Sequence, residues 1–301
     1  MARARELRRS IDWGSLAPLA LRSREVAEGV YAGGHRSARR GAGVEFGGHR
    51  EYVPGDDLRW LDRRSLLRHD HLLVRQFETE TDRALRLVVD ATLSMTYRGD
   101  KAPGAKIAFA ALVAAALGRV AVSSGDPVGL TFIGGEEARG VPVSGGREAF
   151  ERLMAALESV QPGGDARTTP EVVERALAGI ARTARRGSII VILSDLLDLP
   201  ESAVDLFASL ASRGRVLVVV QTLDADEATL PFSGTVRLRA LEGGEVVETD
   251  PEATRERYLE ALHVLQDRYR RALVARGARF VLARTDDDPV ETVRAIVEAA
   301  R

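Results

Sequence analysis

The stretch LRLVVDATLSMTYRG, residues 85–99, begins as an apolar run typical of a strand in the interior of a sheet. The run ends in an aspartate, Asp90, and two hydroxyl residues follow at alternate positions, Thr92 and Ser94. A carboxylate at the mouth of a buried strand is costly unless a partner neutralises it or donates hydrogen bonds to it. The stretch therefore predicts a buried strand whose end carries a polar site.

From residue 84 onward, short β-branched runs alternate with longer helical patterns. Strands that are apolar along their whole length and separated by helices indicate a mostly parallel sheet covered on both faces. We therefore predict an α/β, Rossmann-like doubly wound domain over residues 83–301. The predicted strands are 84–90, 126–135, 137–144, 188–195, 215–221 and 278–284, and the predicted helices are 104–124, 146–160, 171–184, 200–214, 251–277 and 288–301.

Two segments do not follow this alternation. Residues of about 230–250 have the pattern of a β-hairpin that turns at Gly243-Gly244. Residues 1–82 are irregular and rich in Gly and Arg, with possible strands at 44–53 and 71–80, and we expect them to form a small separate N-terminal module.

Three loops are expected to meet at the carboxyl edge of the sheet, where open α/β sheets bind ligands. The first carries Asp90, Thr92 and Ser94, and the second, GGDARTTP, carries Thr168 and Thr169 just before a helix. The third, LSDLLD, places Asp195 at the end of a strand. Mg²⁺ prefers oxygen ligands in a near-octahedral shell. These oxygens therefore predict a site for Mg²⁺, or for Mn²⁺ or Ca²⁺.

Two points in this interpretation have alternatives. Thr168 is the preferred ligand and Thr169 the preferred helix cap, with Thr169 as the alternative ligand, because the two are adjacent. An aspartate followed by Thr and Ser is also common in a simple turn or helix cap that binds no ion.

An enzyme interpretation competes for Asp90, because an aspartate at this position is the nucleophile of haloacid-dehalogenase-type phosphatases. Those enzymes need a second aspartate two residues later, and Thr92 cannot exchange protons near pH 7 as a carboxylate can. The sequence also has no G-x-S-x-G, Walker or dinucleotide-binding fingerprint. We therefore expect a binding module and not an enzyme.

VVDATLSM, the threonine loop and VILSDLLD together resemble the metal-ion-dependent adhesion site of von Willebrand factor A domains. The segment at residues 43–80, which includes REYVPGDD, resembles the part that precedes such a domain in the family called domain of unknown function 58. The resemblance implies an A-type fold and metal-dependent protein binding. Thr92 stands where the usual motif has Ser, and Leu93 stands where it often has Gly.

The resemblance also implies a partner, a MoxR-type AAA+ ATPase, with which the protein would assemble or activate a client that offers a carboxylate to the ion. A metal-independent interaction scaffold is the alternative. Asp56 and Asp57, in the turn PGDDLRW, are candidates for a partner-docking loop, although local pairing with arginines is the simpler interpretation.

Composition limits the other possibilities. The net charge of −1 gives no general attraction to nucleic acid or to a membrane surface. The absence of cysteine excludes disulfides and thiolate metal sites. The longest apolar run, residues 107–117, is shorter than the roughly 18 residues of a membrane span. The N-terminus has no signal-peptide pattern. We therefore expect a cytoplasmic protein without a transmembrane segment.

Overall fold

The computed structural model describes most of the chain, which forms two units. The described residues are 19–32, 45–51, 73–78, 83–100, 102–136, 138–166, 169–239, 241 and 246–301. Contacts group Met1–His35 with Arg83–Arg301, and Arg36–Asp82 forms the second unit. The second unit ends at residue 82, where the sequence analysis placed the domain boundary, but a helix near the N-terminus belongs to the larger unit.

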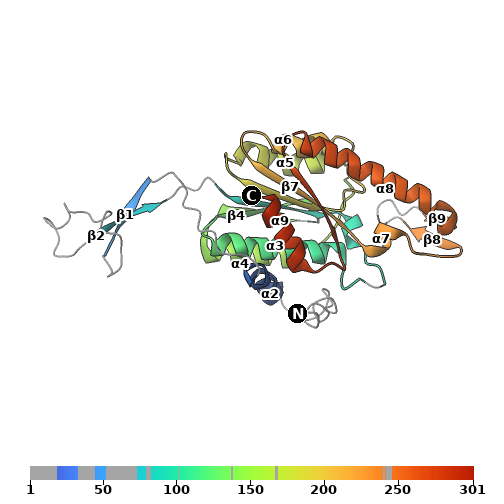
Figure 1. The fold of residues 1–301 in the computed structure, drawn as a ribbon, viewed down its shortest axis with the longest axis horizontal. Coiled ribbons are helices and arrows are strands. Elements are labelled where there is room, and N and C mark those ends of the chain that lie inside the picture. The colour runs from blue at the N-terminus through green and yellow to red at the C-terminus, as the bar shows by residue number, and fades with distance from the viewer. Residues whose placement is uncertain are drawn as a thin grey trace. The chain divides into compact units, whose positions relative to one another are not determined.

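The larger unit is built on a six-stranded sheet with the order β10-β7-β6-β3-β4-β5 (Figure 1). All neighbouring strands run parallel except β5, which is antiparallel to β4 at one edge. The mostly parallel, doubly wound sheet is therefore confirmed. The strands are β3 (Leu85–Ala91), β4 (Val128–Gly134), β5 (Val141–Ser144), β6 (Ile189–Ser194), β7 (Val216–Leu223) and β10 (Arg279–Arg284).

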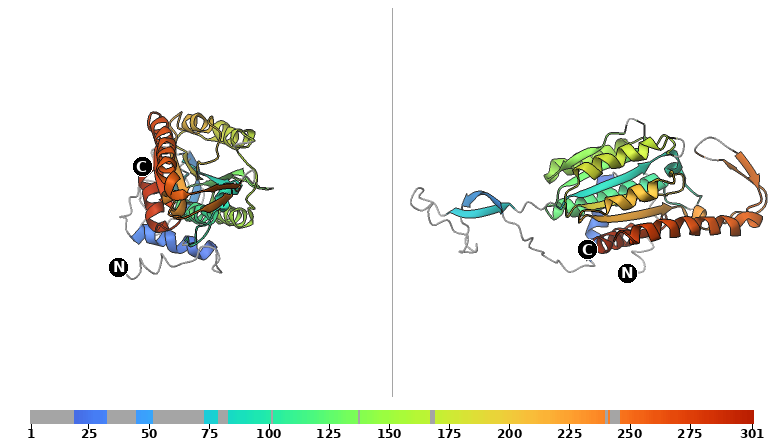
Figure 2. Two further views of the ribbon diagram at one scale, coloured as in Figure 1. Left: turned by 90° about the vertical axis from the view of Figure 1, so that its right-hand side faces the viewer. Right: turned by 90° about the horizontal axis from the view of Figure 1, so that it is seen from above.

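Helices cover both faces of this sheet, as the views in Figures 1 and 2 show. One face packs against α3 (Lys106–Ser123), α4 (Gly146–Ser159) and α9 (Pro289–Ala299), and α2 (Leu19–Ala32) packs on the outer side of these helices. The other face packs against α5 (Glu171–Thr183), α6 (Ala203–Leu210) and α8 (Pro251–Val274). Each face has its own apolar core, so the central strands β3, β6 and β7 are buried on both sides.

The central helix of the first face is α3, whose residues from Phe109 to Leu117 are all buried. Its many alanines allow close approach to the sheet and to α4. At Gly118 the approach is so close that a Cβ there would lie 2.5 Å from Cδ2 of Leu153 in α4. By length and composition α3 could also cross a membrane, and 67% of it is buried inside the protein. A mostly buried core helix can have the same length and composition.

Helix α2 is an element that the sequence analysis did not predict. Leu19, Val26 and Ala27 are buried, and the first two belong to the core on the α3 side of the sheet. Tyr31 donates a hydrogen bond of 3.2 Å to the carbonyl of Val120 in α3. These contacts explain why the helix belongs to the larger unit although about 50 residues of the chain separate it from β3.

Smaller elements complete the chain. A 3-10 helix, η3 (Leu93–Thr96), follows β3, and the short helix α7 (Ala225–Thr229) follows β7. The predicted hairpin is present as β8 (Val236–Arg239) and β9 (Val246–Thr249), which pair antiparallel. In the second unit, β1 (Glu45–Glu51) and β2 (Leu73–Glu78) also pair antiparallel, with an irregularity between Phe46 and Gly48.

Candidate functional site

The site lies where β3 and β6 end side by side. The two strands are parallel neighbours, and Val89 is level with Leu193 in their register. The next residues along the strands are Asp90 and Ser194, so the pairing brings a carboxylate and a hydroxyl together at the carboxyl edge of the sheet. Both residues are buried, with exposed fractions of 1% and 0%.

The Asp90 carboxylate accepts three hydrogen bonds from its surroundings. Its Oδ1 accepts from the backbone N–H of Thr92 at 3.0 Å and from the Thr92 hydroxyl at 2.7 Å. Its Oδ2 accepts from the Ser194 hydroxyl at 2.6 Å. The Thr92 and Ser94 hydroxyl oxygens are 3.1 Å apart. The structure thus brings Asp90, Thr92 and Ser94 together, and the first two form the turn that was the alternative interpretation.

Burial, followed by the charge of Asp195, raises the pKa of Asp90 from an ordinary 3.8 to about 6, although the bonds from Ser194 and Thr92 act in the opposite direction. Two carboxylates near one another and away from water favour any cation that comes close. The electrostatics of this edge therefore suit a positive ligand.

Asp195, the predicted ligand from the third loop, is held by another group. Its Oδ2 accepts a hydrogen bond of 2.7 Å from the ammonium of Lys106, and its Oδ1 accepts from the backbone N–H of Leu197 at 3.1 Å. The backbone carbonyl of Asp195 accepts from the Gln221 amide at 2.9 Å. Asp195 thus lies at the predicted edge, already paired with a cation that belongs to the protein.

Lys106 is the first residue of α3, and none of its surface is exposed. Its ammonium also lies 2.6 Å from Oε1 of Glu227 and 5.8 Å from the centre of the Tyr97 ring. Burial alone would lower the pKa of Lys106, but Asp195 and Glu227 raise it above its usual value, so the side chain stays protonated. Oε2 of Glu227 accepts from the N–H of Asp224 in the capping box of α7, which fixes the carboxylate.

The threonine loop reaches the same edge through its glycines. The N–H of Gly163 donates to the carbonyl of Ala91 at 2.9 Å, and the N–H of Leu93 donates to the carbonyl of Gly164 at 3.3 Å. Thr168 lies outside the described residues. Thr169 was predicted as the N-cap of α5, but α5 begins after Pro170 and no side-chain hydrogen bond caps it. Proline already fixes the backbone there and has no N–H to satisfy.

Comparison with known proteins identifies the family of this chain. The family model "Protein of unknown function DUF58" matches residues 48–268. The chain belongs to the DUF58 family. It is also 30% identical to the uncharacterized proteins Rv1480 of Mycobacterium tuberculosis and Mb1516 of Mycobacterium bovis, over 95% of this chain and 89% of each relative. The resemblance drawn from residues 43–80 and the metal motif is therefore confirmed at the level of the family.

Solved structures similar to this DUF58 chain include BatB of Bacteroides thetaiotaomicron, with 17% identity, a TM-score of 0.48, and coverage of 72% of this chain and 98% of that one. They also include a von Willebrand factor type A protein of Catenulispora acidiphila, with 14% identity, a TM-score of 0.42, and coverage of 76% and 44%. The SpRpn10 VWA domain has 12% identity, a TM-score of 0.40, and coverage of 70% and 93%.

The donors of this DUF58 chain fit a hard divalent ion in chemical type. Asp90, Thr92 and Ser94 would hold the ion, which would supply a Lewis-acidic centre for a carboxylate of a partner. The described residues contain no cluster of three or more Asp, Glu, His or Cys side chains suited to a metal. A site made of one or two carboxylates and several hydroxyls does not form such a cluster.

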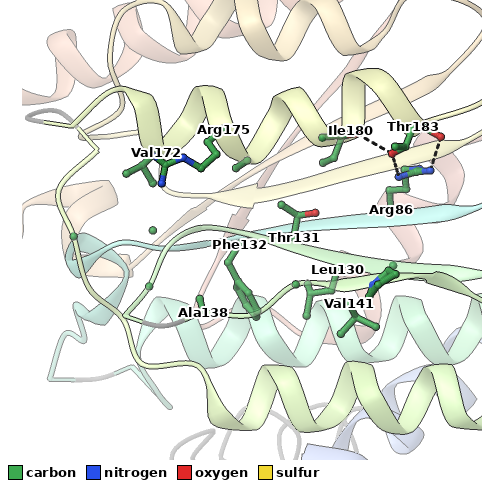
Figure 3. A pocket seen from close by; sticks show the side chains of 18 of the residues that line it. Arg86, Leu130, Thr131, Phe132, Ala138, Val141, Val172, Arg175, Ile180 and Thr183 are labelled. Carbon is green, nitrogen blue, oxygen red and sulfur yellow. Dashed lines mark hydrogen bonds between the residues drawn. The ribbon is translucent and has the colours of Figure 1, made fainter.

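A groove of about 920 Å³ lies beside this edge, between α5 and the strands β4 and β5 (Figure 3). Gly134, Gly163 and Gly164 line it, and so do Arg86 and Arg175. The Arg86 guanidinium donates to the hydroxyl and carbonyl of Thr183. Asp90 and Asp195 do not line the groove.

Three residues that contact the candidate ligands, directly or in the case of Glu227 through Lys106, were not found from the sequence. Ser194 precedes Asp195 directly, and the strand register alone could have indicated that it faces Asp90. Lys106 and Glu227 lie far from the motif along the chain. The one sequence signal for Lys106 is its rarity, since Lys101 and Lys106 are the only lysines among 43 basic residues. Asp56 and Asp57, the predicted docking residues, lie outside the described residues.

Proposed function

We propose that this DUF58 protein is a divalent-metal-dependent protein-binding module that acts with a MoxR-type AAA+ ATPase in the assembly or activation of client proteins. The ion would be Mg²⁺, or Mn²⁺ or Ca²⁺, held by Asp90, Thr92 and Ser94. Asp195 and Thr168 would contribute from the neighbouring loops. A carboxylate of the partner would complete the shell.

The observation that carries this proposal is the arrangement of oxygens around Asp90. Hydroxyl groups from two strand ends, those of Thr92 and Ser194, lie within 2.7 Å of one buried carboxylate. Neutral hydroxyl ligands leave a divalent ion electron-poor, so a partner's carboxylate would bind it strongly. The family and the MoxR-type partner enter through the DUF58 resemblance, and binding to that ATPase is the part that the experiment must test.

A catalytic role for Asp90 is the less favoured alternative. The residue two positions later is Thr92, and its hydroxyl donates to Asp90. A phosphatase of this geometry needs an acid at that position to protonate the leaving group. We therefore propose that the protein is not an enzyme. Turnover of p-nitrophenyl phosphate that Asp90→Asn abolishes would contradict this.

A metal-independent scaffold is favoured by one specific observation. The ammonium of Lys106 already neutralises Asp195, and hydrogen bonds already reach both oxygens of Asp90. Such an edge is electrostatically complete enough to fold with no ion. The scaffold would bind its partner through surfaces that Asp90 does not control.

A binding experiment distinguishes the two. The full chain is immobilised, and binding of a purified MoxR-type ATPase from the same organism is measured in Mg²⁺ and in EDTA. The metal-dependent module predicts binding in Mg²⁺ that EDTA and Asp90→Ala both remove, while the control Asp205→Ala, an exposed carboxylate of α6, keeps it. Binding that survives EDTA and Asp90→Ala supports the scaffold. Absence of binding in every condition contradicts the proposed partnership.

A further inference from the structure

The ion pair between Lys106 and Asp195 is the feature of this edge that the proposed function does not use. Its atoms are 2.7 Å apart, and the exposed side-chain fractions of the two residues are 0% and 1%. A buried ion pair of this kind is costly to form, because both ions lose their water. Its presence beside a candidate metal ligand calls for a functional explanation.

The surroundings of Lys106 show that it could release Asp195 and remain neutralised. Glu227 lies 2.6 Å from the same ammonium, on the side of α7. The Glu227 carboxylate is fixed by the N–H of Asp224, and the Tyr97 ring faces the ammonium at 5.8 Å. An ammonium has three donors. Two of them reach carboxylates here, so the loss of one leaves the other in place.

Within the described part of the chain Asp195, in contrast to Lys106, has no second partner of opposite charge. Its carboxylate lies between the Lys106 ammonium and the proposed ion position at Asp90. It contacts Lys106 directly and lies close enough to Asp90 to raise the pKa of that group. Each oxygen of Asp195 already accepts a hydrogen bond, from Lys106 and from the N–H of Leu197. Each carboxylate oxygen has a second lone pair, so an ion could contact Asp195 beside these donors, but it would then lie close to the Lys106 ammonium, and an ammonium close to a dication is repelled.

We propose that Lys106 and the divalent ion compete for Asp195, so that this internal cation lowers the ion affinity of the site. With no ion bound, Lys106 holds Asp195 and keeps the edge folded. When an ion binds, Lys106 gives up Asp195 and retains Glu227. The inference rests on the proposed metal-binding function and adds a regulating residue from α3, outside the metal motif.

Lys106 could instead help the ion to bind, and this role predicts the opposite change in ion affinity when Lys106 is removed. If Lys106 only positions Asp195 for the ion, its removal lowers the affinity. If it competes, its removal raises the affinity, because Asp195 becomes available and a repelling charge disappears. The sign of the change in Mn²⁺ affinity therefore decides between the two roles.

The test is calorimetric titration of Mn²⁺ into the full chain, metal-free at the start, for wild type and Lys106→Gln. The glutamine amide can still donate to one carboxylate, which favours folding, and circular dichroism verifies the fold. Competition predicts that Lys106→Gln binds Mn²⁺ at least tenfold more tightly than wild type. Arg147→Gln, which removes the same charge from an exposed position of α4, is expected to leave the affinity within twofold.

Two further variants test whether the change in affinity depends on the charge of Lys106 and on the carboxylate of Asp195. Lys106→Arg retains the cation and is expected to keep the wild-type affinity, even if Lys106→Gln does not fold. Adding Asp195→Asn to Lys106→Gln is expected to remove the gain, because the gain depends on Asp195. Wild-type binding with equal or weaker binding by Lys106→Gln overturns the competition alone. No binding by wild type or by any variant overturns the metal site and the competition together.

Discussion

The Ser194 hydroxyl lies 2.6 Å from Oδ2 of Asp90, and this contact joins the ends of two parallel strands that are 104 residues apart in sequence. The same Ser194 oxygen accepts from the N–H of Leu196, whose φ of 63° lies in the left-handed region. One hydroxyl thus connects the first motif loop to the third. The candidate site depends on that connection.

Ser194→Ala is expected to destabilise the protein by about 1.5–3 kcal/mol, because a buried carboxylate loses a charge-assisted hydrogen bond. Chemical denaturation of wild type and variant at neutral pH measures this. Ser209→Ala, at an exposed position of α6, is the matched control and is expected to change the free energy of unfolding by less than about 0.5 kcal/mol. Equal effects of the two substitutions would show that the contact with Asp90 does not stabilise the fold.

The pKa of Asp90 gives the metal-free protein a specific pH dependence. Because this pKa is about 6 in the folded protein and 3.8 ordinarily, the folded state holds its proton to higher pH. Between these values the unfolded state binds fewer protons, so the stability contributed by Asp90 is present below pH 3.8 and is lost as pH rises through 6. The loss is about 3 kcal/mol, at about 1.4 kcal/mol for each unit.

Asp90→Asn removes this titration. Unfolding measured in EDTA from pH 4.5 to 7.5 is therefore expected to show a stability advantage of the variant over wild type that grows with pH. A constant difference between the two proteins across this range would mean that Asp90 keeps an ordinary pKa.

Gly134→Ala tests the contact between the glycine loop and the strand end. At this position φ is 70°, and a Cβ would lie 2.9 Å from the carbonyl oxygen of Gly163 and 3.0 Å from Cγ2 of Thr92. Gly234 has the same φ and open space around it, so Gly234→Ala carries the backbone strain alone. We expect Gly134→Ala to cost about 1–3 kcal/mol more than Gly234→Ala in thermal or chemical unfolding. Equal losses of unfolding free energy in the two variants would mean that the loop shifts to accommodate the new Cβ without disturbing Thr92.

Most of the fold could be predicted from the sequence, because the apolar runs that form the sheet carry a clear pattern. Runs such as the one ending at Asp90 are apolar except for a single residue, Arg86, which is typical of parallel strands with both faces covered. Helix α2 escaped prediction because its pattern is weak, and its burial depends on α3 and α9, which come later in the chain.

The candidate site could be predicted only as far as local spacing reaches. Asp90, Thr92 and Ser94 are two residues apart, so their meeting needs only one turn. Lys106 reaches Asp195 across 89 residues and Glu227 across 121, and no local pattern encodes such contacts. The sequence therefore indicated which oxygens gather at the edge, and the structure was needed to find the cation already there.

Ion binding at Asp90 is measured most directly by calorimetric titration of Mn²⁺ into the metal-free full chain and into Asp90→Ala. Asp205→Ala, an exposed carboxylate of α6, is the control. We predict saturable binding of one ion to wild type and to the control, and an affinity at least a hundredfold lower in Asp90→Ala. Equal binding by wild type and Asp90→Ala, or no binding by wild type, would contradict it.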